Sequence, residues 1–152
     1  MIDDEDAPVP RFTTSSWSSA GIATLDAVGH DARSALEAGL QAVLALTVVP
    51  EQALVDTRRS APIRGAGNDL GSLFADLLED FLEQIEFFGG GLHDVAVDGV
   101  LRRDDGGYVS WGQAFGTLDA ASPVVVPHLL GSPTASEGAA HGVIIHASLQ
   151  RS

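Results

Sequence analysis

The pattern of apolar and polar positions predicts a first amphipathic helix after Asp31. Glycine and aspartate at Gly29–Asp31 form a turn that supplies Asp31 as the helix N-cap. The helix should run for about four turns and stop near Thr47–Pro50. Its apolar face consists of Ala32, Leu36, Gly39, Leu40, Val43 and Leu44. Its polar face consists of Arg33, Glu37 and Gln41.

A second helix is predicted between Asn68 and the glycines Gly89–Gly91. Asn68 is the expected N-cap, Asp69 adds a carboxylate to the first turn, and the glycines end the helix. This helix has an apolar stripe on one face and acidic residues on the opposite face. The simplest interpretation is that water solvates the acidic face, and the alternative is that its carboxylates bind a cation. The apolar stripe is Leu70, Leu73, Phe74, Leu77, Leu78, Phe81, Leu82 and Ile85, and the acidic residues are Asp76, Glu79, Asp80, Glu83 and Glu86.

Alternating and β-branched stretches predict the strands. Pro62 cannot donate a hydrogen bond to a strand ladder, so its strand should be an edge strand or a broken one. Asp104–Gly107 is a hairpin turn, and loops are expected at Gly65–Asn68 and Gly131–Ala140. The expected strands are Phe12–Ser19, Gly21–Val28, Leu54–Arg64, Leu92–Arg103, Tyr108–Gly116, Pro123–Leu130 and Gly142–Leu149.

This order of elements predicts an α+β fold. We expect a two-layer sandwich in which the two amphipathic helices pack on one face of a mostly antiparallel sheet of about seven strands. Residues 1–10 carry four acidic residues and two prolines and should form a flexible acidic tail. Residues 11–152 should form a single domain.

Charge and composition narrow the function. The 152 residues carry a formal net charge of −13, and all eight basic residues are arginine. A negative field of this size argues against direct binding to nucleic acid. The absence of cysteine excludes disulfides, thiol nucleophiles and iron–sulfur clusters. No signal peptide or membrane span is recognisable, so we expect a cytoplasmic protein with no membrane contact.

Few residues are candidates for chemistry. Neither glycine cluster matches a phosphate-binding loop, and no serine lies in a nucleophile motif. Among the five histidines, His128 and His146 lie on the last two expected strands and could meet across the sheet. Without a nucleophile or an orienting carboxylate, an enzyme that uses either histidine as a base is the least favoured reading.

Several short stretches resemble the archease family. Asn68–Glu83 is similar to the family's second-helix segment, with its Asp-Leu start and its leucines interspersed with acidic residues. Ser19–Ile22 stands where archeases have an Asp-x-Gly-(Ile/Leu) step, and Ser110–Gln113 resembles their Gly-Glu step. Val124–His128 occupies the place of their Lys-Ala-x-Thr-Tyr-His stretch, and Val143–Leu149 that of their closing strand.

The resemblance implies an archease-like fold and a role without enzymatic activity. Archeases assist the RtcB-type RNA ligase, which joins tRNA exons and repairs RNA, by promoting its guanylylation and turnover. They bind a divalent cation, usually assigned as calcium. The partner implied for this chain is therefore an RNA-splicing ligase of the RtcB type, and the sequence does not predict an oligomeric state.

The cation-binding motif is altered in this chain. The family's His-Thr-Ala-Asp stretch reads Ser16-Trp17-Ser18-Ser19, so serine replaces both its histidine and its aspartate. The family-equivalent metal positions are Ser16, Ser19 and His146, with His128 nearby. Hydroxyl groups are weak ligands for a hard cation, so calcium binding is doubtful. The alternative function is a diverged domain that binds a small ligand or a transition metal through Ser16, Ser19, His128 and His146.

Overall fold

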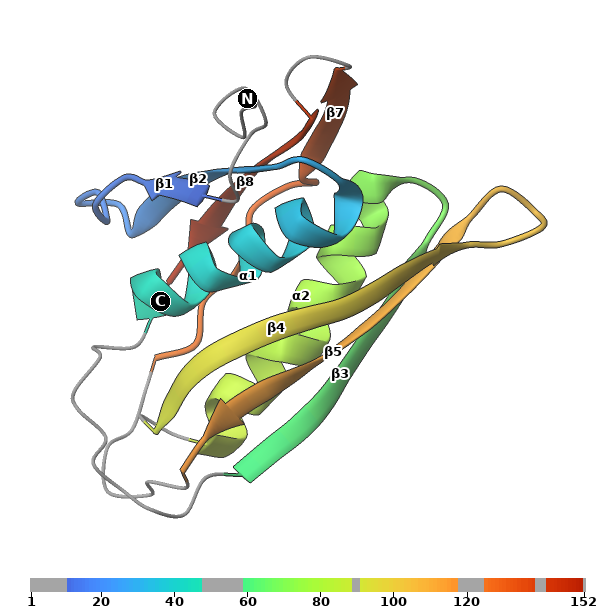
Figure 1. Cartoon of the computed structure of the whole chain (residues 1–152). Helices are drawn as coiled ribbons and strands as arrows, with labels where there is room; N and C mark the ends of the chain where they lie inside the picture. Colours follow the sequence, from blue (N-terminus) through green and yellow to red (C-terminus); the bar gives the residue numbers. More distant parts are fainter. Residues whose placement is uncertain (1–10, 48–58, 89–90, 118–124, 139–141, 152) are drawn as a thin grey trace, which may run out of the picture.

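The computed structural model describes residues 11–47, 59–88, 91–117, 125–138 and 142–151 (Figure 1). These residues form two helices, α1 (Ala32–Thr47) and α2 (Leu70–Phe88), and eight strands. The strands are β1 (Arg11–Thr14), β2 (Ile22–Gly29), β3 (Arg59–Gly67), β4 (Leu92–Arg102), β5 (Tyr108–Gly116), β6 (His128–Leu129), β7 (Thr134–Gly138) and β8 (Gly142–Gln150). The expected tail at residues 1–10 lies outside the described residues.

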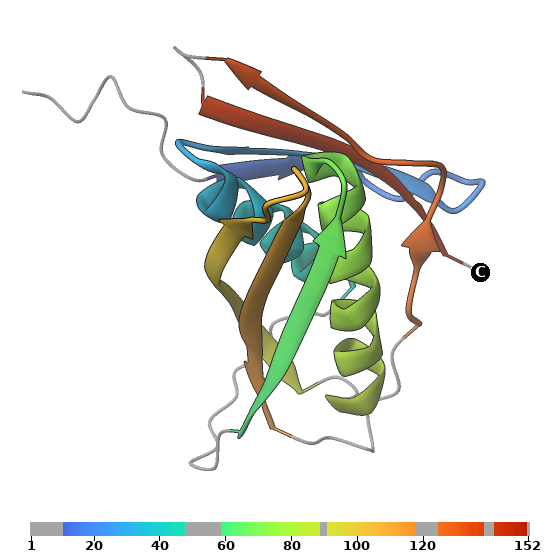
Figure 2. The ribbon, with the colours of Figure 1, turned by 90° about the vertical axis from the view of Figure 1, so that its right-hand side faces the viewer.

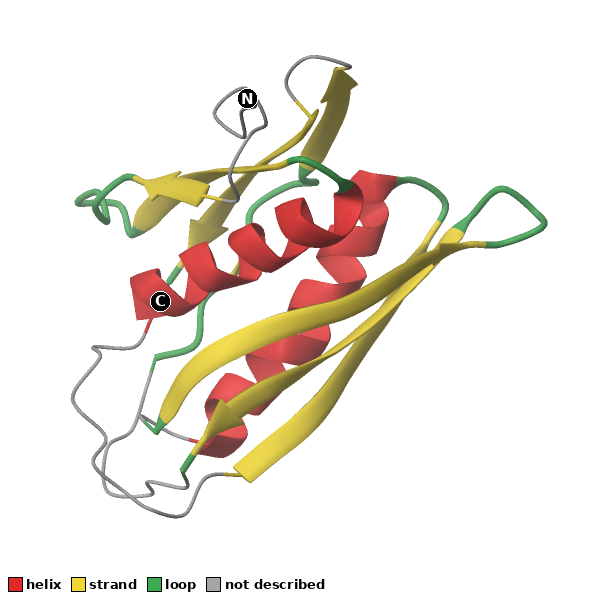
Figure 3. Cartoon of the chain, in the orientation of Figure 1, coloured by secondary structure: helices red, strands yellow, loops and turns green. Residues whose placement is uncertain are grey.

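The described strands form two antiparallel sheets. A five-stranded sheet has the order β1-β2-β8-β6, and β7 pairs with β8 on the same side as β6. A three-stranded sheet has the order β3-β5-β4. The predicted α+β class, with two helices packed on antiparallel strands, is confirmed. The number of described strands is one higher than expected, and the strands are divided between two sheets rather than joined in one (Figure 3).

The two helices lie in the angle between the sheets (Figure 2). Helix α1 contacts β2 of the five-stranded sheet and β4 of the three-stranded sheet, while α2 contacts β3, β5 and β7. Small residues allow α1 to contact both sheets. The buried positions of α1 include Ala35, Ala38, Gly39 and Ala42, and they cover a wider arc of the helix surface than a narrow apolar stripe would. A helix buried over so wide an arc needs covering on two sides, and two sheets supply it.

The glycines before α2 belong to a strand rather than to the expected loop at Gly65–Asn68. Strand β3 continues to Gly67, where it pairs with Tyr108. A Cβ atom on Gly65 would lie 2.6 Å from the nitrogen of Leu77, and one on Gly67 would lie 2.4 Å from the nitrogen of Leu73. Glycine is used here because α2 packs directly on the strand backbone.

The other differences concern the ends of strands. The predicted loop Gly131–Ala140 contains β7, whose mostly polar residues pair with β8 and show no apolar alternation. Strand β6 covers two residues of the predicted Pro123–Leu130, and β1 ends at Thr14 rather than Ser19. Backbone pairing with β8 and β2, rather than side-chain pattern, decides these boundaries.

Both helices begin with the same capping arrangement. Ser34 donates its N–H to the carboxylate of Asp31 at 2.9 Å, and Ser72 donates its N–H to Asp69 at 2.8 Å. The N-cap of α2 is therefore Asp69 and not the expected Asn68. The bond from the Ser72 N–H, reinforced by the Ser72 side chain, holds the pKa of Asp69 below its ordinary value. The carboxylate also suits the positive end of the helix dipole.

Side chains of α2 bond to the free edge of β3. The N–H of Arg64 donates to Asp80 at 2.8 Å, and the N–H of Ala66 donates to Asp76 at 2.8 Å. Pro62 lies at the same alternate position and has no N–H to leave unpaired. The expectation that water alone solvates the acidic face of α2 is therefore wrong in part. Two of its carboxylates cover a strand edge that could otherwise pair with another strand.

The opposite edge of the three-stranded sheet bonds to α1 in the same way. The N–H of Val97 on β4 donates to Glu37 at 2.9 Å, and Arg33 donates to the carbonyl of Val97 at 2.8 Å. Arg33 and Glu37 also pair with each other at 3.2 Å. The polar face predicted for α1 is therefore used to protect an edge strand.

The core is continuous from the helices to both sheets. It includes Leu25 and Ile145 from the larger sheet, Ile63 and Val95 from the smaller one, and Phe74 of α2 between them. In the described part of the chain, neither helix combines the length and apolar character needed to cross a membrane.

Truncation of the core stripe should destabilise the protein strongly. Leu77 is fully buried in α2, so Leu77→Ala removes apolar contacts and leaves a cavity. We expect a loss of about 2–5 kcal/mol in the free energy of unfolding, measured by denaturant titration. Glu86→Ala, at an exposed position of the same helix, is the control and should change stability by less than about 0.5 kcal/mol.

Removal of the carboxylates that cover β3 should expose its edge. The double variant Asp76→Ala/Asp80→Ala frees the N–H groups of Arg64 and Ala66, and we expect concentration-dependent aggregation by light scattering. The control, Glu79→Ala/Glu83→Ala, removes the same charge from exposed positions of α2. Equal aggregation of both variants would attribute the effect to net charge instead of to the edge.

Candidate functional site

Ser16 and Ser19 lie in the loop that joins β1 to β2. Trp17 anchors this loop, because its indole nitrogen donates to the carbonyl of Leu46 at 3.2 Å and the guanidinium of Arg151 stacks 4.8 Å from its ring centroid. Both serines are exposed. Their hydroxyl groups form no hydrogen bond with the described residues, so they are accessible but have no organised ligand geometry.

His146 pairs with an aspartate that the sequence analysis did not single out. It lies opposite Asp26 in the register of β8 and β2, and its Nδ1 is 2.7 Å from an Asp26 carboxylate oxygen. Thr13 and Thr134 continue this row on the neighbouring strands. The sequence indicates that Asp26 shares the polar face of its strand with Thr24, because the two are two residues apart. Only the register of β2 and β8 shows that Asp26 meets His146.

His128 is distant from His146. It pairs with Gln150, which lies four residues along β8 from His146, or about 13 Å at the rise of a strand. The two histidines therefore do not meet across the sheet, and His128 and His146 cannot bind one metal ion together. Within the described ranges, no three histidine, aspartate or glutamate side chains are grouped closely enough to hold a metal ion.

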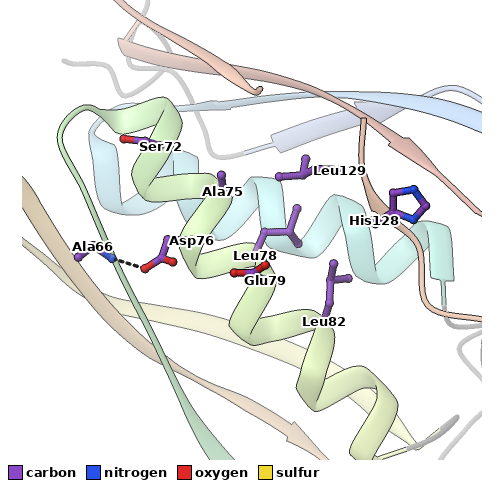
Figure 4. Close-up of a pocket in the computed structure, with 9 residues that line it drawn as sticks. All are labelled: Ala66, Ser72, Ala75, Asp76, Leu78, Glu79, Leu82, His128 and Leu129. Carbon is purple, nitrogen blue, oxygen red and sulfur yellow. Dashed lines mark hydrogen bonds between the residues drawn. The ribbon is translucent and has the colours of Figure 1, made fainter. Parts of the chain in front are cut away.

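A groove lies between α2 and β6, and we call it the α2–β6 groove (Figure 4). Its volume is about 380 Å³. Helix α2 supplies one wall, and His128 and Leu129 of β6 supply the other. Apolar lining comes from Ala75, Leu78, Leu82 and Leu129, and polar lining comes from Ser72, Asp76, Glu79 and His128.

The two acidic residues of the groove have different tasks. Asp76 accepts the N–H of Ala66, whereas Glu79 is exposed and forms no ion pair with the described residues. Glu83, one turn further along α2, is also exposed. Apolar side chains beside the exposed carboxylate of Glu79 suit an amphipathic segment that carries arginine or lysine. The groove therefore has the chemistry to receive a segment with basic side chains.

Comparisons with known proteins bear on the fold alone. No protein-family model matches the chain, and no curated protein sequence matches it. The structure is similar to the solution structure of protein 1598 of Methanobacterium thermoautotrophicum, a structural-genomics target. The TM-score is 0.63 at 18% sequence identity, over 93% of this chain and 98% of that protein. At this identity the likeness shows a shared architecture and not a shared activity.

Calcium should bind weakly or not at all. Ser16 and Ser19 offer neutral hydroxyl groups, and the carboxylate of Asp26 is paired with His146. Calorimetric titration in chelator-treated buffer should show no binding in the range of calcium sensors, about 0.1–10 μM. Affinity in that range would contradict the prediction and would point to other carboxylates, of which the acidic face of α2 is the first candidate.

Proposed function

We propose that this chain is a non-enzymatic accessory protein of the archease type, which assists an RtcB-type RNA-splicing ligase by promoting its guanylylation and turnover. The proposal includes a cytoplasmic location, and it assumes that the family's cation site is altered here. The sequence resemblance over the second helix and the strands supplies the identity of the ligase partner. The predicted order of the two helices and the first five strands is also the order in the structure, and this supports the proposal.

The α2–β6 groove is the observation that carries the proposal. It combines apolar side chains with the exposed carboxylate of Glu79, which forms no ion pair with the described residues, and Glu83 follows on the same helix. An enzyme that holds RNA must present basic surface, and an acidic protein can dock on such a surface without touching the RNA itself. The net charge of −13 favours the same kind of partner.

The ligand-binding alternative has less structural support. It requires Ser16, Ser19, His128 and His146 to act on one ligand, whereas His128 and His146 belong to separate rows of the sheet and His146 is paired with Asp26. The groove beside His128 could take a small ligand by itself, but its acidic rim favours a cationic group.

A pull-down of the organism's own ligase tests the docking. We expect the ligase to bind at low salt and to bind less as salt rises, because screening weakens pairing between exposed charges. Glu79→Lys should reduce binding, and it should reduce the stimulation of ligase guanylylation to the same extent. Glu86→Lys makes the same charge change on α2 outside the groove and should behave like the unmodified protein.

Two results would contradict the proposal. Absence of the ligase from the pull-down at both salt concentrations would exclude the accessory role. Equal loss of binding with Glu79→Lys and Glu86→Lys would show that overall charge, and not the groove, attracts the ligase.

A further inference from the structure

The three-stranded sheet has one face that the described elements leave open. Both helices pack on its other face, as Figure 2 shows. Trp111 of β5 is on this open face and is 45% exposed. A hollow of about 570 Å³ lies beside it, lined also by Pro62, Arg64, Asp98 and Gln113. Exposed tryptophan and arginine side chains are typical of the central residues of protein interfaces.

The position of Trp111 is set by the neighbouring strand. The β4–β5 register shifts between Val97 and Gly99, so the chain bulges at Asp98. A Cβ atom on Gly99 would lie 2.4 Å from the indole ring of Trp111, which shows that the ring lies directly over this glycine. The bulge and the glycine therefore seat the indole over β4, and the exposed Asp98 lines the hollow beside it.

Opposite charges flank Trp111 on this face. Arg64 is its register partner on β3, and Asp98 lies on the other side, on β4. Both are exposed, and neither forms an ion pair with another side chain among the described residues. The face thus presents an unpaired cation and an unpaired anion on either side of an aromatic centre.

We propose that this open face binds a second copy of the same chain. A two-fold axis parallel to β5, between the two facing sheets, places β3 of one copy over β4 of the other and leaves the position along the strands unchanged. Arg64 then faces Asp98 of the second copy, twice per dimer, and the two Trp111 side chains lie on either side of the axis, each seated over β4 of its own copy.

The rows on either side of Trp111 agree with this arrangement. Pro62 and Ala96 are the strand partners of Gln113, so the axis sets Pro62 of one copy against Ala96 of the other. In the row of Val109, the axis likewise sets Ala66 against Leu101. Apolar residues therefore meet apolar residues, and opposite charges meet in the central row.

This self-complementarity favours a second copy over an unlike partner. A sheet of three strands and nine residues measures about 14 Å by 30 Å, which is a small area for a specific interface. We therefore expect a reversible dimer with a dissociation constant of about 10–100 μM.

Charge exchange across the interface tests the proposal. Sedimentation velocity of the whole chain up to a concentration of about 300 μM should show reversible dimers. Arg64→Asp should weaken the dimer about tenfold or more, because two carboxylates then face each other, and Asp98→Arg should do so for the opposite reason. The double variant Arg64→Asp/Asp98→Arg restores opposite charges and should restore the dimer to within about threefold.

Arg11→Asp is the control, because it makes the same charge change on β1 of the other sheet and should leave the dimer unchanged. These side chains are exposed, and circular dichroism of each variant will verify that it folds. A monomer at every concentration would overturn the proposal and leave the face to an unlike partner. Weakening by Arg11→Asp equal to that by Arg64→Asp, or a double variant as weak as the single ones, would overturn it as well.

Discussion

Hydrogen bonds from helix side chains to the edges of the three-stranded sheet organise much of this structure. Three strands leave two open edges, and unpaired backbone groups at such edges invite another strand to pair. Here Asp76 and Asp80 of α2 accept N–H groups of β3, and Glu37 and Arg33 of α1 bond to Val97 of β4. These contacts fix the small sheet to both helices while the apolar faces of the helices remain free for the core.

This arrangement determines where the molecule can meet others. The edges of the three-stranded sheet are occupied, and the inner faces of both sheets are filled by the helices. The open face around Trp111 and the α2–β6 groove are two of the surfaces that the described elements leave free. They differ in chemistry, because the first carries both charges around an aromatic ring and the second carries acidic groups over an apolar floor. A self-complementary contact and a basic partner can therefore use separate surfaces of one small domain.

Elements with strong side-chain periodicity can be located from the sequence alone. Both helices and the β4–β5 hairpin were predicted nearly to the residue, since apolar spacing and turn chemistry are local signals. Prediction from the sequence fails where the structure of a residue depends on contacts with distant parts of the chain. Gly65 is predicted in a loop, but it lies in strand β3, where the close packing of α2 leaves no room for a side chain. Asp76 looked solvated because the sequence does not show the strand edge beside it, and the pairing of Asp26 with His146 depends on strand register.

Amide hydrogen exchange, followed residue by residue by NMR, tests the edge protection most directly. The amides of Arg64, Ala66 and Val97 should exchange as slowly as amides bonded within the sheet, although they lie on outer edges. In the Asp76→Ala/Asp80→Ala variant, measured below the concentration at which it aggregates, protection should be lost at Arg64 and Ala66 and kept at Val97, which bonds to Glu37 instead. Exchange of these amides at the rate of unstructured chain in the unmodified protein would contradict the role assigned to the helix carboxylates.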